Sequence, residues 1–194
     1  VAASLRRNGI PAQPLPAETD ESFVRGRGST RGGECLPCPA TLGSFLDTVK
    51  KAGGGPGEHA LLMPTASGPC RFGQYCTQNR LALDDEGWDP VRIVSWTSSN
   101  NYAGLPPAAR RYMWTGLLLG DLLFKLRCRV LPYEVNPGET EALFERWKAR
   151  LVVAMEQGLK LETEVKAAHD AFAAVPRHPG RKPLVGIVGE IYVR

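Results

Sequence analysis

The sequence predicts an α/β fold with a parallel sheet of three or four strands, followed by a helical connector and the first strand of a second lobe. Two observations predict this fold class. Short apolar runs that suit strands alternate with longer stretches whose apolar residues recur at helical spacing. Glycine and proline separate these segments, as they do at element boundaries. Strands that alternate with helices are typical of a parallel sheet covered by helices.

The elements of the first two-thirds of the chain follow from this pattern. They are an extended piece at 10–15, a helix at 39–52, a strand at 59–63, a helix at 72–86, a strand at 91–96 and a helix from 106 to about 126. The first of these helices has apolar residues three and four apart and ends at the glycine run 53–55. Pro106 and Pro107 mark the start of the last helix, because proline fits the first turn.

The next segment changes character. Residues 136–139 read Asn-Pro-Gly-Glu, which is a helix start signal, and apolar residues then recur every four positions. We therefore expect one long or two short helices over 140–175, followed by a basic, proline-rich linker and an apolar strand. The predicted organisation is an α/β lobe at 1–135, a connector and linker at 136–180, and the first strand of a further lobe at 181–194. A chain that stops just after opening a strand suggests a fragment of a longer protein.

Composition excludes several classes of protein. The chain has 194 residues, of which 43% are apolar and 23% are charged, and these are globular values. A net charge of +4 with scattered basic residues does not indicate a nucleic-acid partner. The most apolar stretch, 113–124, is shorter than a membrane span and contains Asp121. With no secretory signal at the N-terminus, the cytoplasm is the expected compartment. Five cysteines without such a signal favour free, metal-ligating or redox thiols.

Four of the five cysteines lie in two loops, each directly before a predicted helix. The first loop contains Cys35 and Cys38, and the second contains Cys70 and Cys76. The second loop follows the strand at 59–63, so it lies at the sheet edge where ligands bind in α/β folds. A helix N-terminus favours the thiolate, which is the form that binds iron or zinc. The sequence therefore predicts a metal site that includes Cys35 and Cys70, with Cys38 as a further candidate ligand.

Three polar side chains follow Cys70 on the start of the next predicted helix. They are Arg71, Gln74 and Tyr75, and we expect them to donate hydrogen bonds to a ligand or to cluster sulfides. No catalytic acid or base can be named from the sequence, and whether the chain itself is an enzyme is left open.

Other interpretations of the cysteines remain. A zinc site is poorly matched, since Cys70 and Cys76 are six positions apart and the three histidines are scattered. Cys35 and Cys38 have the spacing of a thiol–disulfide oxidoreductase, but polar and glycine residues precede them instead of an apolar strand. A third alternative is a non-catalytic interaction domain in which the cysteines are inert. For Cys128 the sequence favours a buried structural role. For Cys76 a structural role and a functional role are equally well supported.

Four stretches carry a resemblance to a known family. They are GGECLPCPATLG at 32–43, MPTASGPCRFGQY at 63–75, NYAGL at 101–105 and KPLVGIVGEIYVR at 182–194. Together they resemble the 2-hydroxyacyl-CoA dehydratase-like region of the large acyl-CoA dehydratase activase-related proteins. The resemblance covers nearly the whole chain, and the activase region itself is not visible in it.

The resemblance implies a Rossmann-like lobe with helices on both faces and an iron–sulfur cluster, expected to be [4Fe–4S]. Cys35 matches the first cluster cysteine of the family and Cys70 the second, while Cys38 is an extra. A further ligand is implied beyond Arg194. In such proteins an ATP-dependent activase delivers a low-potential electron that drives reductive or radical dehydration chemistry, usually on a CoA thioester. The implied partners are thus an activase region or subunit and a CoA thioester, in an anaerobic cytoplasm, with the oligomeric state left open.

Overall fold

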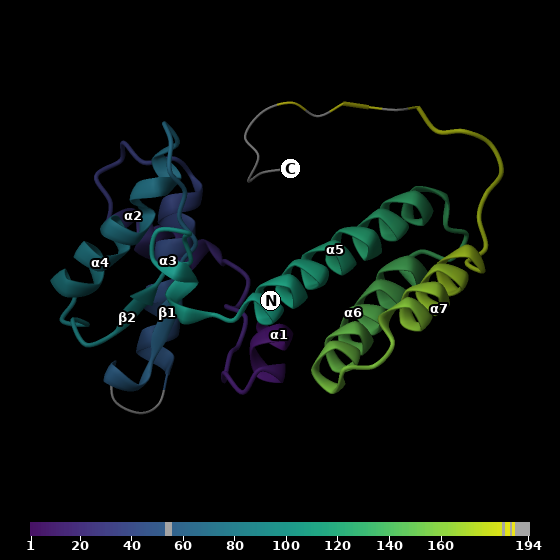
Figure 1. Ribbon diagram of the computed structural model, residues 1–194. Coiled ribbons are helices and arrows are strands. Elements are labelled where there is room, and N and C mark those ends of the chain that lie inside the picture. Colours follow the sequence, from purple (N-terminus) through teal and green to yellow (C-terminus); the bar gives the residue numbers. More distant parts are fainter. Residues whose placement is uncertain (53–55, 184, 187, 189–194) are drawn as a thin grey trace. The chain divides into compact units, whose positions relative to one another are not determined.

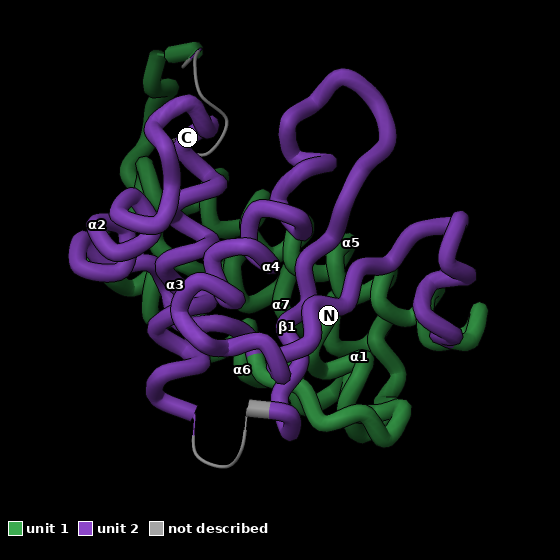
Figure 2. The backbone as a smooth tube through the Cα atoms, turned by 90° about the vertical axis from the view of Figure 1, so that its left-hand side faces the viewer, with its two compact units in different colours: residues 1–13, 106–187 green, residues 14–105, 188–194 purple. Residues whose placement is uncertain are grey.

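The computed structural model describes residues 1–52, 56–183, 185–186 and 188. The fold is mostly helical and contains a small parallel sheet. The chain divides into two compact units (Figure 2). Unit 1 comprises the described residues of 1–13 and 106–187, and unit 2 those of 14–105 and 188–194. Within the described residues, no helix is both long enough and apolar enough to cross a membrane.

Unit 1 is a group of packed helices. It contains α1 (Ala2–Arg7), α5 (Pro107–Val130), α6 (Glu139–Gln157) and α7 (Leu161–Ala173), with a short 3₁₀ turn, η4 (Leu131–Tyr133), after α5 (Figure 1). The stretch 140–175 thus forms two helices. Gly158 ends the first of them, because it adopts a left-handed conformation (φ +69°) that favours glycine. The core of unit 1 is apolar and includes Leu119, Leu123, Leu143, Trp147, Leu151, Met155 and Phe172.

A buried carboxylate joins α6 to α7 in this unit. Glu164 is only 7% exposed, and Arg150 donates from Nη2 to Oε1 at 3.0 Å and from Nε to Oε2 at 2.5 Å. This hydrogen-bonded guanidinium lowers the pKa of Glu164, against the opposing effect of burial. The pair therefore stabilises the fold above the pKa of the unfolded chain, and this contribution is lost as the pH falls through the lower folded-state pKa.

Replacing Arg150 with methionine should expose this dependence. The variant Arg150→Met leaves Glu164 buried without its partner, so we expect a lower free energy of unfolding than in the wild type. The deficit should be larger at about pH 7 than at about pH 4, where Glu164 is closer to neutral in the variant. Urea unfolding at both pH values measures the deficit. A deficit of equal size at the two pH values would contradict this role for the pair.

Unit 2 carries the sheet. It contains α2 (Asp20–Gly28), α3 (Pro37–Lys51), β1 (Ala60–Leu62), α4 (Tyr75–Asp85) and β2 (Arg92–Val94), with 3₁₀ turns η1 (Pro56–Glu58), η2 (Arg71–Gln74) and η3 (Asn101–Gly104). The two strands are parallel, and Leu61 pairs with Ile93. Its core includes Cys38, Leu42, Phe45, Leu46, Leu61, Tyr75, Leu83 and Val91.

The mostly helical fold with its small parallel sheet is compatible with the predicted α/β class, and it differs from the prediction in several details. Within the described residues the sheet has two strands, where the sequence predicted three or four. The extended piece at 10–15 is not a strand; Pro11 and Pro14 lack the N–H donors that pairing needs. The helix predicted for 106–126 is α5, which extends to Val130 and packs with α6 and α7 in unit 1. Most of the strand expected at 182–194 lies outside the described residues, and the described ones there form no strand.

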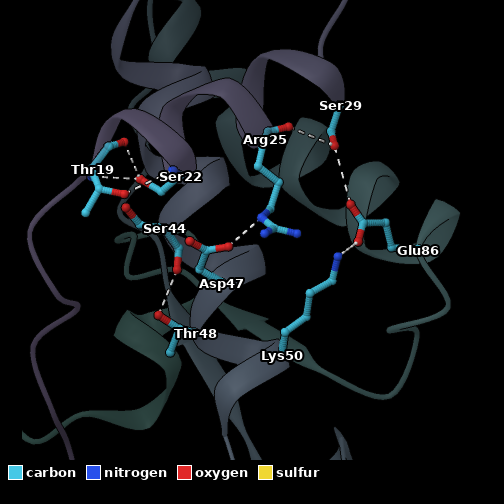
Figure 3. Close-up of polar contacts among 9 residues, drawn as sticks. All are labelled: Thr19, Ser22, Arg25, Ser29, Ser44, Asp47, Thr48, Lys50 and Glu86. Carbon is cyan, nitrogen blue, oxygen red and sulfur yellow. Dashed lines mark hydrogen bonds and ion pairs between the residues drawn. The ribbon is translucent and has the colours of Figure 1, made fainter.

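Helix α2, which the sequence did not predict, packs closely on α3. At their crossing a Cβ on Gly26 would lie 1.8 Å from the Pro39 carbonyl oxygen, and one on Gly43 would lie 1.7 Å from the Ser22 carbonyl oxygen. Only glycine allows the two backbones to approach this closely. Polar contacts surround the crossing (Figure 3). Arg25 pairs with Asp47 at 2.5 Å, and Lys50 of α3 pairs with Glu86 after α4 at 2.5 Å.

Candidate functional site

A pocket in unit 2 opens where the two cysteine loops meet. Its volume is about 340 Å³, and it is lined by Gly33, Glu34, Cys35, Cys38, Arg71, Gln74, Tyr75 and Gln78. The first four residues come from the loop before α3 and its first turn, and the others come from η2 and the start of α4. This volume is within the range of small-ligand sites, about 300–1,000 Å³.

The start of α3 sets the positions of the first two cysteines. Pro37 is at the first helical position, where its missing N–H costs nothing, so the helix begins directly after the loop. The Cys38 N–H donates to the Cys35 carbonyl at 2.9 Å. As a result Cys38 is buried in the core of unit 2, while Cys35 remains partly exposed beside the pocket.

The second loop folds back on itself before α4. A Cβ on Gly73 would lie 2.6 Å from the Ala66 carbonyl oxygen, so this turn requires glycine. The Thr65 hydroxyl donates to the Gly73 carbonyl at 3.3 Å and closes the loop. Cys70 therefore sits at the N-cap of η2 with its side chain exposed, directly before Arg71.

Two side chains of the second loop region reach the first loop. Arg71 donates from Nη1 to the Gly33 carbonyl at 2.5 Å. The Tyr75 hydroxyl donates to Cys35 Sγ at 3.3 Å. Phe72 holds the tyrosine ring by an edge-on contact with a centroid distance of 5.3 Å. The two cysteine loops are thus joined by a cation and by a hydroxyl that is aimed at a cysteine sulfur.

The electrostatics of the pocket depend on burial and on the neighbouring thiols. Burial is the main cause that raises the pKa of Tyr75, and its hydrogen bond to Cys35 and the charges of Cys35, Cys38 and Cys70 add to the effect. Three of the five cysteines therefore act on one phenol. Burial, with Glu34 and Cys35 nearby, raises the pKa of Cys38 to about 11. Backbone N–H groups, first that of Arg31, lower the pKa of Glu34.

The raised pKa of Cys38 leads to a testable difference in thiol reactivity. A thiol with a pKa of about 11 is neutral near pH 8, and Cys38 is also buried, whereas Cys128 is exposed. Because the thiolate is the nucleophile, we expect iodoacetamide to modify Cys38 at least about 100-fold more slowly than Cys128 in the native protein. Peptide mass spectrometry over a time course measures both rates. Comparable rates would contradict the burial of Cys38.

The structure brings most of the sequence-predicted residues to this pocket. Those that line it are Cys35, Cys38, Arg71, Gln74 and Tyr75. Cys70 is outside the lining, although its thiol is close enough to act on Tyr75. Sequence reasoning missed Gln78. Its position could have indicated it, because it lies three residues after Tyr75 on the same helix and residues at this spacing share a face. Its amide donates to the Ser29 carbonyl at 3.3 Å.

The remaining cysteines lie elsewhere. Cys76 is half-buried, its thiol donates to the Met63 carbonyl at 3.3 Å, and burial raises its pKa. These contacts favour a structural role for Cys76 over a ligand role. Cys128, expected to be buried, is instead exposed. The reason is that α5 turns Leu119, Leu123 and Leu126 toward the core of unit 1, which leaves Cys128 on another side of the helix.

Neither the arrangement of the side chains nor comparison with known proteins identifies what this pocket binds. Among the described residues, no group of three or more His, Cys, Asp or Glu side chains is arranged to hold a metal ion. Comparison of the chain with models of protein families, with curated proteins and with solved structures finds no match.

Proposed function

We propose that unit 2 binds an iron–sulfur cluster, expected to be [4Fe–4S], through Cys35 and Cys70. In this proposal the chain takes part in ATP-activated, low-potential electron transfer for reductive or radical dehydration chemistry, like the 2-hydroxyacyl-CoA dehydratase subunits that it resembles. A Rossmann-like lobe, an activase partner and a CoA thioester substrate belong to the same proposal. The observation that carries it is the meeting of the two cysteine loops at Tyr75, whose hydroxyl donates to Cys35 Sγ at 3.3 Å.

The types of side chain at the two loops support this proposal. Iron–sulfur clusters are held by cysteine thiolates. Hydrogen-bond donors directed at the ligating sulfurs are the usual outer shell of these sites. Cys35 has such a donor in the Tyr75 hydroxyl. Each loop also contains a glycine, Gly33 in the first and Gly68 in the second, beside which a Cβ would meet no atom within 4 Å, so there is open space next to the backbone. Two thiols are fewer than the four that a [4Fe–4S] cluster takes, so the proposal includes further ligands from outside these loops.

Each residue around the pocket has a defined task in this proposal. When bound, the cluster supplies one-electron redox chemistry. Tyr75 places a hydroxyl donor against Cys35 Sγ, which stabilises negative charge on that sulfur. Arg71 adds a cation at the mouth of the pocket and ties its loop to Gly33. Cys38 remains neutral at physiological pH, so it adds no further negative charge.

The alternative functions have less support. In a thiol–disulfide oxidoreductase, Cys35 would be the attacking thiolate and the buried Cys38 its resolving thiol, but polar and glycine residues precede this pair instead of an apolar strand. A non-catalytic interaction domain leaves the Tyr75–Cys35 contact without a task. We therefore regard both as weaker proposals.

Anaerobic reconstitution tests the proposal. The protein is incubated with ferrous iron, sulfide and dithiothreitol, which can fill the remaining coordination positions, and is then desalted. We expect a visible absorption band that dithionite bleaches, because reduction changes the charge-transfer bands of the cluster. The oxidoreductase alternative predicts instead a colourless protein that reduces insulin disulfides. A colourless protein without that activity would favour the interaction domain.

A further inference from the structure

Helix α5 carries a second apolar face that unit 1 does not bury. On one side, Leu119, Leu123, Leu126 and Val130 enter the core of unit 1. Large apolar side chains are nevertheless exposed elsewhere on the helix, and they are Trp114, Leu117, Leu118, Leu122 and Phe124. Large apolar side chains that gather on an exposed surface often mark a protein–protein contact. The exposed face is therefore a candidate interaction surface, independent of the proposed cluster.

The centre of this face has a regular spacing. Trp114, Leu118, Asp121, Lys125 and Cys128 follow one another at intervals of four, three, four and three residues, and we call this line the α5 stripe. The alternation of four and three is the seam of a coiled coil. Leu117, Leu122 and Phe124 flank it.

The α5 stripe has two opposite charges at its middle. Asp121 and Lys125 are exposed, and no ion pair within the described part of the chain involves either of them. In a two-fold symmetric contact, residue i faces residue j and residue j faces residue i. An antiparallel pair of α5 helices can therefore place each Asp121 opposite the Lys125 of the other copy, whereas a parallel pair in register would set like charges together.

This register also matches the apolar positions. When Asp121 faces Lys125, the sequence numbers of facing residues along the α5 stripe always add up to the same value, so Leu118 faces Cys128. Leu118 then meets the small apolar side chain of Cys128, and each charge meets its opposite. We propose that a second copy of the chain packs antiparallel on the α5 stripe, with Asp121 and Lys125 paired reciprocally.

The size of the surface sets the expected strength. The α5 stripe spans about 21 Å, at about 1.5 Å per residue from Trp114 to Cys128. One helix pair of this length buries less area than a standard stable interface, so the dimer should be weak, with a Kd of about 1–100 μM.

Sedimentation equilibrium of the full chain tests the dimer, at concentrations from about 1 to about 300 μM under reducing conditions. We expect a reversible monomer–dimer equilibrium. Leu118→Glu, which buries two charges at the seam, should weaken it at least tenfold, or about 1.4 kcal/mol. The matched control is Leu81→Glu on α4, because Leu81 is 55% exposed and Leu118 is 52% exposed. Circular dichroism checks that both variants keep their helices.

Charge exchange tests the register. Lys125→Asp alone should weaken the dimer by like-charge repulsion, and so should Asp121→Lys alone. The combined variant should regain the wild-type Kd, because each new charge again faces its opposite. In addition, Leu118→Cys should form an intermolecular disulfide with Cys128 under mild oxidation with diamide, and peptide mass spectrometry identifies the bond.

Several outcomes would overturn the proposal. A protein that is monomeric at all concentrations has no such dimer. A dimer that Leu118→Glu leaves intact uses another surface. A dimer that is sensitive to Leu118→Glu but is not restored by the combined charge exchange has a different register.

Discussion

Cys35→Ser and Cys70→Ser are each expected to abolish the visible absorption that remains after anaerobic reconstitution and desalting. The physical reason is that serine replaces a thiolate ligand with a hydroxyl, which is a much weaker ligand for iron in a cluster. The residual ligands from one loop alone are then too few. Loss of at least about 90% of the absorbance is the expected size, because each cysteine supplies a separate bond.

Cys128→Ser is the matched control for these variants. Cys128, like Cys70, is exposed, but it lies on α5 of unit 1 and outside the pocket. The control should retain the full absorbance, and Cys38→Ser should retain most of it, because the Cys38 thiol is buried and neutral at physiological pH. If Cys35→Ser and Cys70→Ser both behave like Cys128→Ser, the assignment of these two ligands is wrong.

Gly26→Ala is expected to separate α2 from α3 and to destabilise unit 2. The new Cβ would lie 1.8 Å from the Pro39 carbonyl oxygen and 2.8 Å from the Gly43 backbone nitrogen, so the backbones themselves must move apart. Overpacking of this kind costs about 3 kcal/mol, which outweighs the gain of up to about 1 kcal/mol from placing alanine in a helix. Hydrogen exchange over residues 20–28 and 37–51, with urea unfolding, measures the change.

Gly28→Ala provides the control on the same helix. Gly28 lies two residues further along α2, and a Cβ there meets no atom within 4 Å. In Gly28→Ala, the hydrogen-exchange protection of α2 and α3 and the free energy of unfolding should be unchanged or slightly raised. Because Gly26 packs against the turn that carries Cys38, Gly26→Ala should also lower cluster retention. Equal stability of the two variants would contradict the close crossing.

The elements that could be predicted are those with a strong local signal. The helix at 39–52 has a periodic apolar face and is observed as α3, and the apolar runs at 59–63 and 91–96 contain β1 and β2. Helix α2 lacked such a signal. It contains few apolar residues, and its glycines read as breaks in a helix although Gly26 makes the close contact with α3. Its capping box, formed by Thr19 and Ser22, is also a weaker pattern in sequence.

The residues of the pocket were largely predictable because they cluster in sequence around two cysteine motifs. Their contacts were not. Whether Tyr75 donates to Cys35 depends on how two loops forty residues apart meet, which no local pattern encodes. The different environments of Cys38 and Cys128 are likewise set by packing: the first lies in the core of unit 2, and the second on an exposed side of α5.

The central claim is that this chain holds an iron–sulfur cluster at Cys35 and Cys70. Iron and acid-labile sulfide, measured per chain on protein prepared without oxygen, test it most directly. Our account predicts iron and sulfide in equal amounts, approaching about four of each per chain after anaerobic reconstitution. Protein that contains neither iron nor sulfide, both as purified and after reconstitution, would contradict it.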